Sequence, residues 1–565
     1  MHRPDKSKAL DVFVSCGTVP TRVNHTGLWR FLTPVREEKL APCRQSCPLG
    51  SGVPRWIEKV REDDWAGAWD VMEQYNPFPA LTGYACYRYC QDECNRGHYD
   101  EAIDIGEIEK AIGLWKLEQG AALKTQNAGK EQGRVALNGQ GKNVAVIGSG
   151  PAGLSAAYYL NRLGVKVTVL EKLPAAGGLL TAGIPPERLP RDILKLELDL
   201  LQQQGITFKT GVEIGQDVPL DALKGDFDAV LLAVGAQERR FLGVPGETLP
   251  GVYDAVAFLQ NLYLAVDHAA RVNDKKILVF GGGNAALDAA SAALRNGSEE
   301  VWVVYRRGRE ELPAHKSEIE AAEEVGVRFM FHTRPVEILG KDTVEGVRLV
   351  ETRPSRRGEG VIDVEDSGYA LPCSAVILAV GSESGLKALF ADDISRSMLY
   401  HGTALLQVLN IPAFSDQEVI CLAAGDAATG PQNIALAIAG GRLAARYLVE
   451  HFYGKQTWQA AFGLDEPLEK AAPTVGFEQL SPHYYPLGGK QAVPKDEAER
   501  CFSCGLCSRC GVCWFFCPDV SVEKEGGQFE FLLDYCKGCG ICAAECPAGV
   551  LEMKELKRHE NAVKR

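Results

Sequence analysis

The sequence has no long apolar run, and nothing in it approaches the roughly 18 apolar residues that suggest a membrane span. It also lacks a basic excess, because 61 Lys and Arg stand against 74 Asp and Glu, giving a formal net charge of −13. A surface that neutralises nucleic-acid phosphates needs the opposite balance. The first residues show no secretory hydrophobic segment and no cleavage pattern. We therefore expect a cytoplasmic protein with no membrane span and no nucleic-acid partner.

Cysteine is scarce along most of the chain, and its placement argues against disulfides. Of the 18 cysteines, only Cys16, Cys373 and Cys421 lie outside two dense groups. Five lie between Cys43 and Cys94, and ten lie between Cys501 and Cys546. A reducing cytoplasm disfavours structural disulfides, so clustered thiols indicate metal ligands. The three isolated cysteines are expected to be small buried side chains.

A strand–helix–strand pattern begins near residue 142. NVAVIG is a β-branched run, SGPAGLSAAYYLNRLG is an Ala-rich helix and KVTVLE is a second strand. The intervening GxGxxG loop contains Gly148, Ser149, Gly150 and Gly153. Its glycines permit a tight turn, close approach of a pyrophosphate and close helix–strand packing. Glu171 ends the second strand, where a carboxylate accepts hydrogen bonds from a ribose. The pattern predicts a dinucleotide site.

The same pattern restarts at KKILVFGGGNAALDAASAALRNGSEEVWVVYRR. Its loop is a GxGxxA variant whose cofactor-binding candidates are Gly281, Gly283, Asn284 and Ala286. The next strand leads into Arg306 and Arg307, where an NAD-specific site would carry an acid. Two guanidinium groups suit a 2′-phosphate, although they could instead lie on a solvated rim and pair with Glu310 or Glu311. We expect NADPH, with NADH as the alternative.

A second glycine pair and a Gly-Asp pair follow the first loop along the chain. Gly177-Gly178 would let a cofactor pass close to the backbone, and Gly425-Asp426 fits a contact to the far end of the first dinucleotide. With GSGPAG, Glu171, GGLL-GIP-RLP, LLAVGA and AAGDAATGP in this order, the chain resembles the small (β) subunit of NADPH-dependent glutamate synthase and related flavoproteins. The resemblance runs over about residues 36–455. It implies that the first loop binds FAD and that Asp426 lies at the ribityl–phosphate portion.

The second nucleotide unit lacks one feature of a related branch. No CxxC follows it, unlike in thioredoxin reductases, where a redox disulfide takes electrons from the flavin. His315 and His332 lie near this unit, and we expect them in surface or helix-cap positions. Hydride transfer to a flavin needs little acid–base help from the protein. We therefore assign no catalytic side chain.

The tail contains the duplicated spacing of bacterial two-cluster ferredoxins, in which the fourth cysteine of each run ligates the other [4Fe–4S] cluster. The expected ligands of one cluster are Cys507, Cys510, Cys513 and Cys546, and those of the other are Cys536, Cys539, Cys542 and Cys517. Zinc is the alternative, but Cys₄ zinc sites usually pair two CxxC units across a longer loop. Cys501 and Cys504 are surplus and could either shift the ligand register or be free thiols.

The N-terminal cysteines resemble the cysteine-rich helical domain of the same family. They occur as Cys43-x3-Cys47-Pro and Cys86-x3-Cys90-x3-Cys94, with EEKLAP where the family has an upstream CxxC. This departure leaves ligands for one cluster instead of two. The expected ligands are Cys47, Cys86, Cys90 and Cys94, with Cys43 as a competitor. By resemblance Glu109 in DIGEIEK could also be a ligand, or it could be a helix-surface residue. Zinc or simple buried thiols are the alternatives for this array.

The expected fold is multidomain, since 565 residues exceed one hydrophobic core. It comprises a helical iron–sulfur domain, two Rossmann-like α/β domains arranged as in glutathione reductase with a discontinuous FAD domain, and an α+β bacterial ferredoxin domain. The expected boundaries are 1–135 for the helical domain, 142–250 and 376–455 for the FAD domain, 251–375 for the NAD(P) domain, 456–495 for a linker and 496–565 for the ferredoxin domain.

These parts predict an FAD- and iron–sulfur-dependent NAD(P)H:acceptor oxidoreductase subunit. It would pass electrons between NAD(P)H, FAD and [4Fe–4S] clusters, two C-terminal and one N-terminal, and then to or from a partner protein. The partner would be a ferredoxin or another subunit, and the ferredoxin fusion resembles subunits found beside 2-oxoacid oxidoreductases. The alternatives are a self-contained glutamate-synthase-type reductase with a small-molecule acceptor, and a non-enzymatic metal scaffold with vestigial nucleotide folds.

Overall fold

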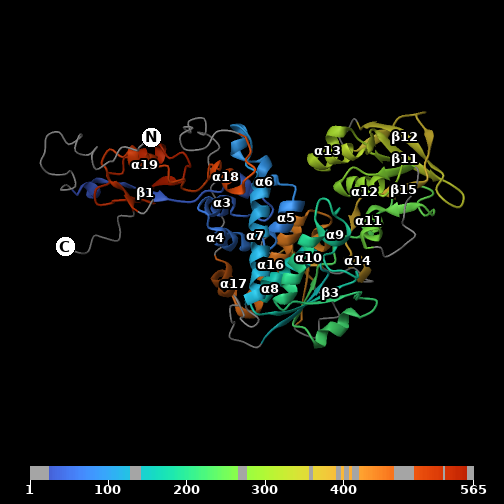
Figure 1. The fold of residues 1–565 in the computed structure, drawn as a ribbon, viewed down its shortest axis with the longest axis horizontal. Helices are drawn as coiled ribbons and strands as arrows, with labels where there is room; N and C mark the ends of the chain where they lie inside the picture. The colour runs from blue at the N-terminus through green and yellow to red at the C-terminus, as the bar shows by residue number, and fades with distance from the viewer. Residues whose placement is uncertain are drawn as a thin grey trace.

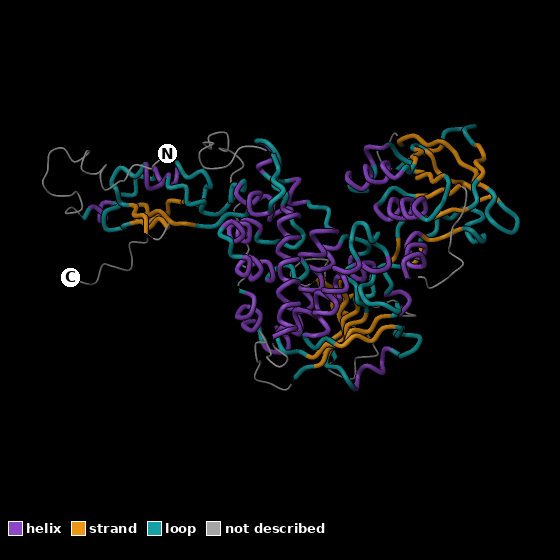
Figure 2. The backbone as a smooth tube through the Cα atoms, viewed as in Figure 1, coloured by secondary structure: helices purple, strands orange, loops and turns teal. Residues whose placement is uncertain are grey.

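The computed structural model describes residues 25–126, 141–264, 276–355, 360–389, 396–399, 406–409, 419–463, 489–525 and 528–556. Cys16, most of the polar segment before residue 142 and most of the expected 456–495 linker lie outside these ranges. The two ends of the elongated molecule are the C-terminal cysteine-rich tail and the second of two parallel sheets (Figure 1). The first sheet and a group of helices lie between them (Figure 2).

The first sheet has seven strands in the order β17-β18-β19-β5-β2-β3-β4. Five are parallel: β2 (Asn143–Ile147), β3 (Lys166–Glu171), β4 (Thr207–Thr210), β5 (Ala229–Leu232) and β19 (Ile420–Ala424). The antiparallel edge consists of β17 (Arg396–Leu399) and β18 (Leu406–Leu409). β5, central in this order, is buried at all four positions, as expected for a parallel strand covered on both faces. β19, which follows the second sheet in sequence, returns to the first sheet and pairs with β5.

Helices connect and cover the strands of the first sheet. They are α8 (Pro151–Arg162), α9 (Leu179–Ala182), α10 (Arg191–Gln203), α15 (Asp426–Thr429) and α16 (Ile434–Tyr453). The Ala-rich sequences of α8 and α16 let the two helices approach closely, and a Cβ at Gly441 of α16 would lie 2.0 Å from the Ala152 carbonyl oxygen of α8. This contact fixes the loop at the start of α8 against the returning segment of the chain.

The second sheet is fully parallel, in the order β10-β9-β8-β15-β7. Its strands are β7 (Val252–Asp254), β8 (Lys276–Phe280), β9 (Glu300–Val304), β10 (Arg328–Met330) and β15 (Ala375–Leu378), and its helices are α11 (Ala255–Leu264), α12 (Asn284–Arg295) and α13 (Lys316–Val325). β15 pairs with both β7 and β8. The chain therefore leaves this sheet after residue 378, and the expected boundary at 375/376 cuts through a strand.

An antiparallel layer and a short ribbon complete the second unit. The layer contains β11 (Thr333–Leu339), β12 (Gly346–Pro354), β13 (Val361–Asp363) and β14 (Tyr369–Pro372). The two passages of the chain between the sheets pair with each other as β6 (Glu238–Arg239) and β16 (Ser382–Glu383). After β16 comes the short helix α14 (Leu386–Leu389).

The N-terminal cysteines lie among short helices, as the sequence predicts. These are α2 (Pro42–Ser46), α3 (Val53–Arg61), α4 (Trp65–Glu73), α5 (Pro79–Ala85), α6 (Tyr89–Asp92) and the longer α7 (Ile105–Gln126). Trp56, Ile57 and Met72 are buried in their own core, whereas Phe78 and Leu81 belong to the core of the first sheet. Arg442 of α16 donates to the carbonyl oxygens of Gln74 and Leu49, at 3.0 and 3.1 Å. The helical domain is therefore docked firmly on the first nucleotide unit.

The tail forms a small α+β module, with one strand supplied by the N-terminal part of the chain. Its own elements are α18 (Pro494–Glu499), α19 (Val512–Phe515), β20 (Val522–Glu525), β21 (Gln528–Phe531), α20 (Ile541–Ala544) and β22 (Leu551–Glu555). β22 pairs antiparallel with β1 (Leu32–Arg36) over five residues of each strand. Residues 32–36 thus belong to the tail module, and the expectation that residues 1–135 form only a helical domain is wrong at this strand.

The segment expected to be a linker begins as a helix. Helix α17 spans Lys455–Phe462, and its Trp458 is buried against the Tyr159 ring at 5.6 Å between centroids. Because this aromatic contact covers α8, the linker begins after α17. Among the described helices, none is long and apolar enough to cross a membrane.

The contact between α8 and α16 predicts a packing defect. Gly441→Ala places a methyl group against the Ala152 carbonyl, and such overpacking typically costs about 1–3 kcal/mol. We expect a lower unfolding temperature for this variant than for the wild-type chain in thermal denaturation. Gly225→Ala is the control, because no heavy atom lies within 4 Å of the added Cβ. Equal unfolding temperatures for both variants would contradict the close packing.

Candidate functional site

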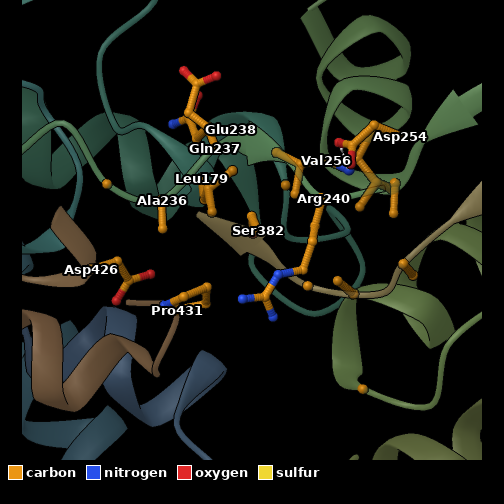
Figure 3. Close-up of a pocket in the computed structure, with 18 of the residues that line it drawn as sticks. Leu179, Ala236, Gln237, Glu238, Arg240, Asp254, Val256, Ser382, Asp426 and Pro431 are labelled. Atoms are coloured by element: carbon orange, nitrogen blue, oxygen red, sulfur yellow. Dashed lines mark hydrogen bonds between the residues drawn. The ribbon is translucent and has the colours of Figure 1, made fainter. Parts of the chain in front are cut away.

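A cleft of about 1160 Å³ brings the two glycine loops together. It lies between the two parallel sheets and is lined by both loops, by the ends of strands from both sheets and by Ala85 and Tyr87 of the helical domain. In Figure 3, Asp426 and Arg240 project into its open region. Ligands of open α/β sheets bind beyond the carboxyl ends of the strands, and these loops occupy that position. The predicted dinucleotide residues therefore converge on one space.

The first loop has the close contacts that its glycines predict. A Cβ at Gly153 would lie 2.0 Å from the Gly148 carbonyl oxygen, so a side chain there would push α8 away from β2. No heavy atom would meet a Cβ at Gly150, which lines the cleft and leaves the approach to the loop open. The start of α8 and its free backbone N–H groups thus face a space where a pyrophosphate would fit.

Glu171 is buried and organises the turn around the first loop. Its Oε2 accepts hydrogen bonds from the Ser149 backbone N–H at 2.8 Å and from Ser149 Oγ at 2.6 Å. Its Oε1 accepts from the Leu173 N–H at 2.9 Å. Ser149 Oγ in turn accepts from the Gly177 N–H at 2.8 Å, which joins the loop to the second glycine pair. Glu171 also lines the cleft, so the carboxylate that holds the loop borders the same space.

Gly178 and Asp426 reach the same cleft from two other segments. Gly178 has φ +54°, and a Cβ there would lie 2.9 Å from Gly150 Cα, so its backbone passes directly over the first loop. Asp426 follows β19, and its Oδ1 accepts from the Gln432 N–H at 3.2 Å. Burial raises the pKa of Asp426 to about 6. The structure brings both residues to the cleft beside the first loop.

The second loop repeats this arrangement on the second sheet. Gly281, Gly283 and Asn284 line the cleft, and Ala286 is buried behind them in α12. Asn284 Oδ1 accepts from the His315 N–H at 3.0 Å, which ties the loop to the start of α13. His315 is the N-cap residue of α13 and stacks on Tyr87, with 5.3 Å between ring centroids. The backbone N–H of His332 donates to the Arg307 carbonyl.

Arg306 and Arg307 lie just beyond β9 and line the cleft. Arg307 Nε stands 3.9 Å from Glu311 Oε1, a long contact between partly exposed groups. Within the described part of the chain, no hydrogen bond or ion pair engages the Arg306 guanidinium, which is exposed. A surface pair of this kind contributes little stability. Both guanidinium groups therefore remain accessible to an anion in the cleft.

Sequence reasoning missed a partly buried ionic contact that joins the two nucleotide units. Arg188 Nη1 lies 3.3 Å from Asp288 Oδ1 and 3.0 Å from Glu318 Oε2, and its guanidinium lies over the Tyr87 ring. Burial raises the pKa of Asp288 to about 7, while Arg188 opposes that shift. Arg188 falls within the RLP segment of the family pattern, but its partners come from the second unit and no local pattern identifies them.

Three N-terminal cysteines gather around Glu109. Burial raises the pKa of Cys86 to about 12, and the Glu109 carboxylate adds to the shift. Burial likewise raises the pKa of Cys90 well above its usual value, with added effects from Cys47, Glu109 and Cys86. Glu109 Oε1 accepts from Asn76 Nδ2 at 2.8 Å and from Thr82 Oγ1 at 2.9 Å. Glu109 therefore faces the thiols, contrary to the helix-surface interpretation.

The other two N-terminal cysteines lie beside the surplus pair of the tail. Burial raises the pKa of Cys43 well above its usual value, and Cys501, Cys504 and Cys94 add to the shift in that order. Asn95 Nδ2 contacts Cys504 Sγ at 3.4 Å. Cys94 adds to the pKa shifts of Cys43 and Cys504, whereas the cysteines that add to the shift of Cys90 are Cys47 and Cys86. Cys90 and Cys94 of the expected set nevertheless pack on the same core.

The tail module has two small cavities, and each is lined by cysteines from both halves of the duplicated spacing. One cavity is lined by Cys507, Cys510, Cys513 and Cys546. The other is lined by Cys517, Cys536, Cys539 and Cys542. The fourth cysteine of each run thus faces the other run, as the crossed ligand pattern predicts. Within the described ranges, no three His, Cys, Asp or Glu side chains are arranged to hold a single metal ion.

Comparison with known protein families covers three parts of the chain. Residues 142–441 match the pyridine nucleotide-disulphide oxidoreductase family. Residues 37–121 match dihydropyrimidine dehydrogenase domain II, 4Fe-4S cluster. Residues 530–552 match the 4Fe-4S binding domain. These matches fall on the cleft, the helical domain and the second half of the tail.

Individual relatives cover most of the chain at about 30% identity. The β subunit of the NADP(+)-dependent formate dehydrogenase of Moorella thermoacetica is 31% identical over 507 residues, or 82% of this chain and 70% of that protein. The glutamate synthase [NADPH] small chain of Escherichia coli (strain K12) is 32% identical over 419 residues, or 71% of this chain and 87% of that protein. The β subunit of the NADPH-Fe(3+) oxidoreductase of Geobacter sulfurreducens is 31% identical over 440 residues, or 72% of this chain and 63% of that protein.

The Glu171 contacts predict a combined loss of stability and of dinucleotide retention. Glu171→Ala leaves the buried Ser149 N–H without its acceptor, which costs about 1–3 kcal/mol. We expect a lower unfolding temperature and a smaller amount of bound dinucleotide per chain after desalting. Glu299→Gln, at an exposed position, should change neither quantity. If Glu171→Ala behaves like this control, the carboxylate does not organise the loop.

Proposed function

Because the chain belongs to the pyridine nucleotide-disulphide oxidoreductase family, we propose that it is the NAD(P)H-linked electron-transfer subunit of a larger oxidoreductase. It is an NAD(P)H-dependent oxidoreductase with FAD and 4Fe-4S domains, and glutamate synthase small chains are among its relatives. In the proposed role, electrons pass between NAD(P)H, FAD and the iron–sulfur clusters, and the tail module exchanges them with a partner protein.

One observation carries this proposal: the cysteine groups follow one another from the cleft to the tail. Cys86 lies between Ala85 and Tyr87, which line the cleft, and it packs on the core of the first sheet together with Cys47. Cys43 and Cys94 lie further along, in the core that also contains Cys501. The cysteines of the duplicated ferredoxin spacing begin six residues after Cys501, and they line the two cavities of the tail module.

The role of each cofactor follows from the number of electrons that it transfers at once. A nicotinamide transfers a hydride and a cluster transfers one electron, so the flavin is the group that converts between them. The chain contributes two glycine loops facing one cleft, with Tyr87 and Arg188 holding the helical domain and the two nucleotide units at that cleft. This arrangement needs no catalytic side chain.

We assign the cofactor contacts by the position of each donor. The first loop with Glu171, Gly178 and Asp426 would hold FAD, and the second loop with Arg306 and Arg307 would hold NADPH. Cys47, Cys86 and Cys90, with Glu109 as the fourth donor, would hold one N-terminal cluster. Thiols and carboxylates suit iron in such clusters because they are anionic when bound. The tail cavities would hold two more clusters through the crossed ligands.

The proposal of a partner protein rests on the names of the relatives, which are subunits of larger enzymes. Two of them are named as β subunits, of a formate dehydrogenase and of an NADPH-Fe(3+) oxidoreductase, and a third is a glutamate synthase small chain. Each name places the relative within a larger enzyme. We propose a partner oxidoreductase subunit for this chain as well, with a 2-oxoacid oxidoreductase as the candidate that the ferredoxin fusion suggests.

The nucleotide preference is tested at the end of β9. Arg306→Ala combined with Arg307→Ala removes both cations that would contact a 2′-phosphate. We expect the ratio of kcat/KM for NADPH to that for NADH to fall roughly tenfold or more. Arg309→Ala is the matched control, because Arg309 pairs with Glu323 of α13. An unchanged ratio in the double variant would reject the NADPH assignment.

The electron outlet is tested in the tail of the full chain. Cys539→Ala removes an exposed cysteine that lines one of the two cavities. We expect NADPH-dependent reduction of a low-potential ferredoxin to fall roughly tenfold or more, while reduction of ferricyanide at the flavin is retained. Cys373→Ala, a buried position in the second nucleotide unit, should preserve both activities. Ferredoxin reduction at the wild-type rate by Cys539→Ala would reject the tail as the outlet.

A further inference from the structure

The Cys501-x2-Cys504 pair lies outside the duplicated ferredoxin spacing, yet Cys501 is buried and Cys504 is partly buried. Cys501 is 8% exposed and belongs to a core that also contains Ile103, Ile108 and Trp56 of the helical domain. Helix α18, just before it, packs against α3 and α7. The pair is therefore part of the helical domain in space, although it belongs to the tail in sequence.

Three hydrogen bonds fix this segment on the helical domain. The Lys39 N–H donates to the Gly505 carbonyl at 3.0 Å. Arg61 Nη2 donates to Ser503 Oγ at 2.7 Å, and Arg96 Nη1 donates to the Arg500 carbonyl at 2.7 Å. Lys39 lies within the EEKLAP segment, so Gly505, the residue after Cys504, contacts the segment that stands where the resemblance places an upstream CxxC.

Two N-terminal cysteines meet this pair. Cys43 and Cys94 pack on the same core as Cys501, and Asn95 Nδ2 contacts Cys504 Sγ. Asn95 directly follows Cys94, and the Ser503 N–H, between the two tail cysteines, lies 3.4 Å from Cys501 Sγ. The four thiols therefore gather in one place. Four thiolates gathered in a poorly solvated place repel one another unless a cation binds them.

We propose that Cys43, Cys94, Cys501 and Cys504 together ligate an additional [4Fe–4S] cluster, which is held jointly by the helical domain and the tail. The helical domain then carries two clusters, one at this site and one at Cys47, Cys86, Cys90 and Glu109. This assignment replaces both expectations for Cys501 and Cys504, namely a register shift in the tail and free thiols. The proposal goes beyond the proposed function, because it concerns the cysteines that ligate an additional cluster and not the partner protein.

The position of the site favours iron–sulfur over zinc. Cys90 of the neighbouring thiol group packs on the same core as Cys43 and Cys94, so the two N-terminal groups adjoin. Cys504 and Cys507 are three residues apart, so their Cα atoms are separated by at most about 11 Å. A redox-active cluster here would bridge the N-terminal group and the first tail cavity, whereas zinc would interrupt the series because it exchanges no electrons.

The shared cluster would also join two parts of the chain that are far apart in sequence. Its ligands come from residues 43–94 and 501–504, so the cluster closes a loop of several hundred residues. Closing so long a loop in the unfolded chain has a large entropic cost, and a bound cluster offsets it in the folded state. Ion pairs from Arg509 to Glu58 and Glu62, at 3.1 and 3.0 Å, continue the same interface into the tail module.

The ligand set is tested by metal analysis of the full chain purified without oxygen. Cys501→Ala combined with Cys504→Ala should lower both iron and acid-labile sulfide by about four atoms per chain. Cys43→Ala should give the same loss while leaving the tail segment intact, so the result does not depend on whether the first variant folds well. Cys373→Ala is the control and should keep the wild-type content. Flavin content and unfolding temperature report the fold of each variant independently.

Combined variants separate this site from a shifted tail cluster. Adding Cys43→Ala to the Cys501/Cys504 variant should cause no further loss, whereas adding Cys513→Ala should raise the total loss to about eight iron atoms. A total loss of about four with Cys513→Ala would overturn the proposal, because Cys504 would then ligate a tail cluster. Unchanged iron in the Cys43→Ala variant, or loss of zinc instead of iron, would also overturn it. None of these readouts uses the partner or the NADPH assay.

Discussion

A buried ion pair in the tail, together with a hydrogen bond from Arg96 to the Arg500 carbonyl 404 residues away, holds the tail on the helical domain. Arg500 pairs with Glu497 at 2.7 Å, and both side chains are about 1% exposed. Arg500 also donates to the Glu101 carbonyl at 2.7 Å, while Arg96 donates to the Arg500 carbonyl. Charges removed from water are tolerated only when they are paired and hydrogen-bonded, and losing one partner of a buried pair typically costs about 3–5 kcal/mol. The contact therefore permits one arrangement of residues 494–505, and the positions of Cys501, Cys504 and the tail module follow from it.

The helical domain contacts both the first nucleotide unit and the segment that begins the tail. On one side, Arg442 holds it to the first nucleotide unit through backbone carbonyls, and Phe78 and Leu81 share the core of that unit. On the other side it contacts α18 and the loop that follows. Electron transfer between fixed carriers depends on constant separations, and a domain docked by core packing on one side and buried charge on the other supplies them. The two sheets also fix relative positions, because each presents its glycine loop to the same cleft.

The two nucleotide units are connected more lightly. Two passages of the chain pair as the short ribbon of β6 and β16, and Arg188 bridges to Asp288 and Glu318. Tyr87 of the helical domain lies against both Arg188 and His315, so one aromatic ring contacts residues of the two units. Tyr87, Arg188 and Asp288 all line the cleft, so these contacts hold the helical domain beside both glycine loops.

The sequence by itself determined the motifs whose residues lie close together along the chain. The GxGxxG loop with Glu171, the GxGxxA loop and the crossed cysteine runs of the tail were all predictable, because each needs specific side chains at short, fixed spacings. Tertiary structure alone decided which distant segments meet. β1 joins β22, β15 belongs to the second sheet, Arg188 finds its acids across the cleft, and Cys43 and Cys94 lie beside Cys501 and Cys504. Such contacts arise from packing and buried charge between segments hundreds of residues apart, and no local spacing encodes them.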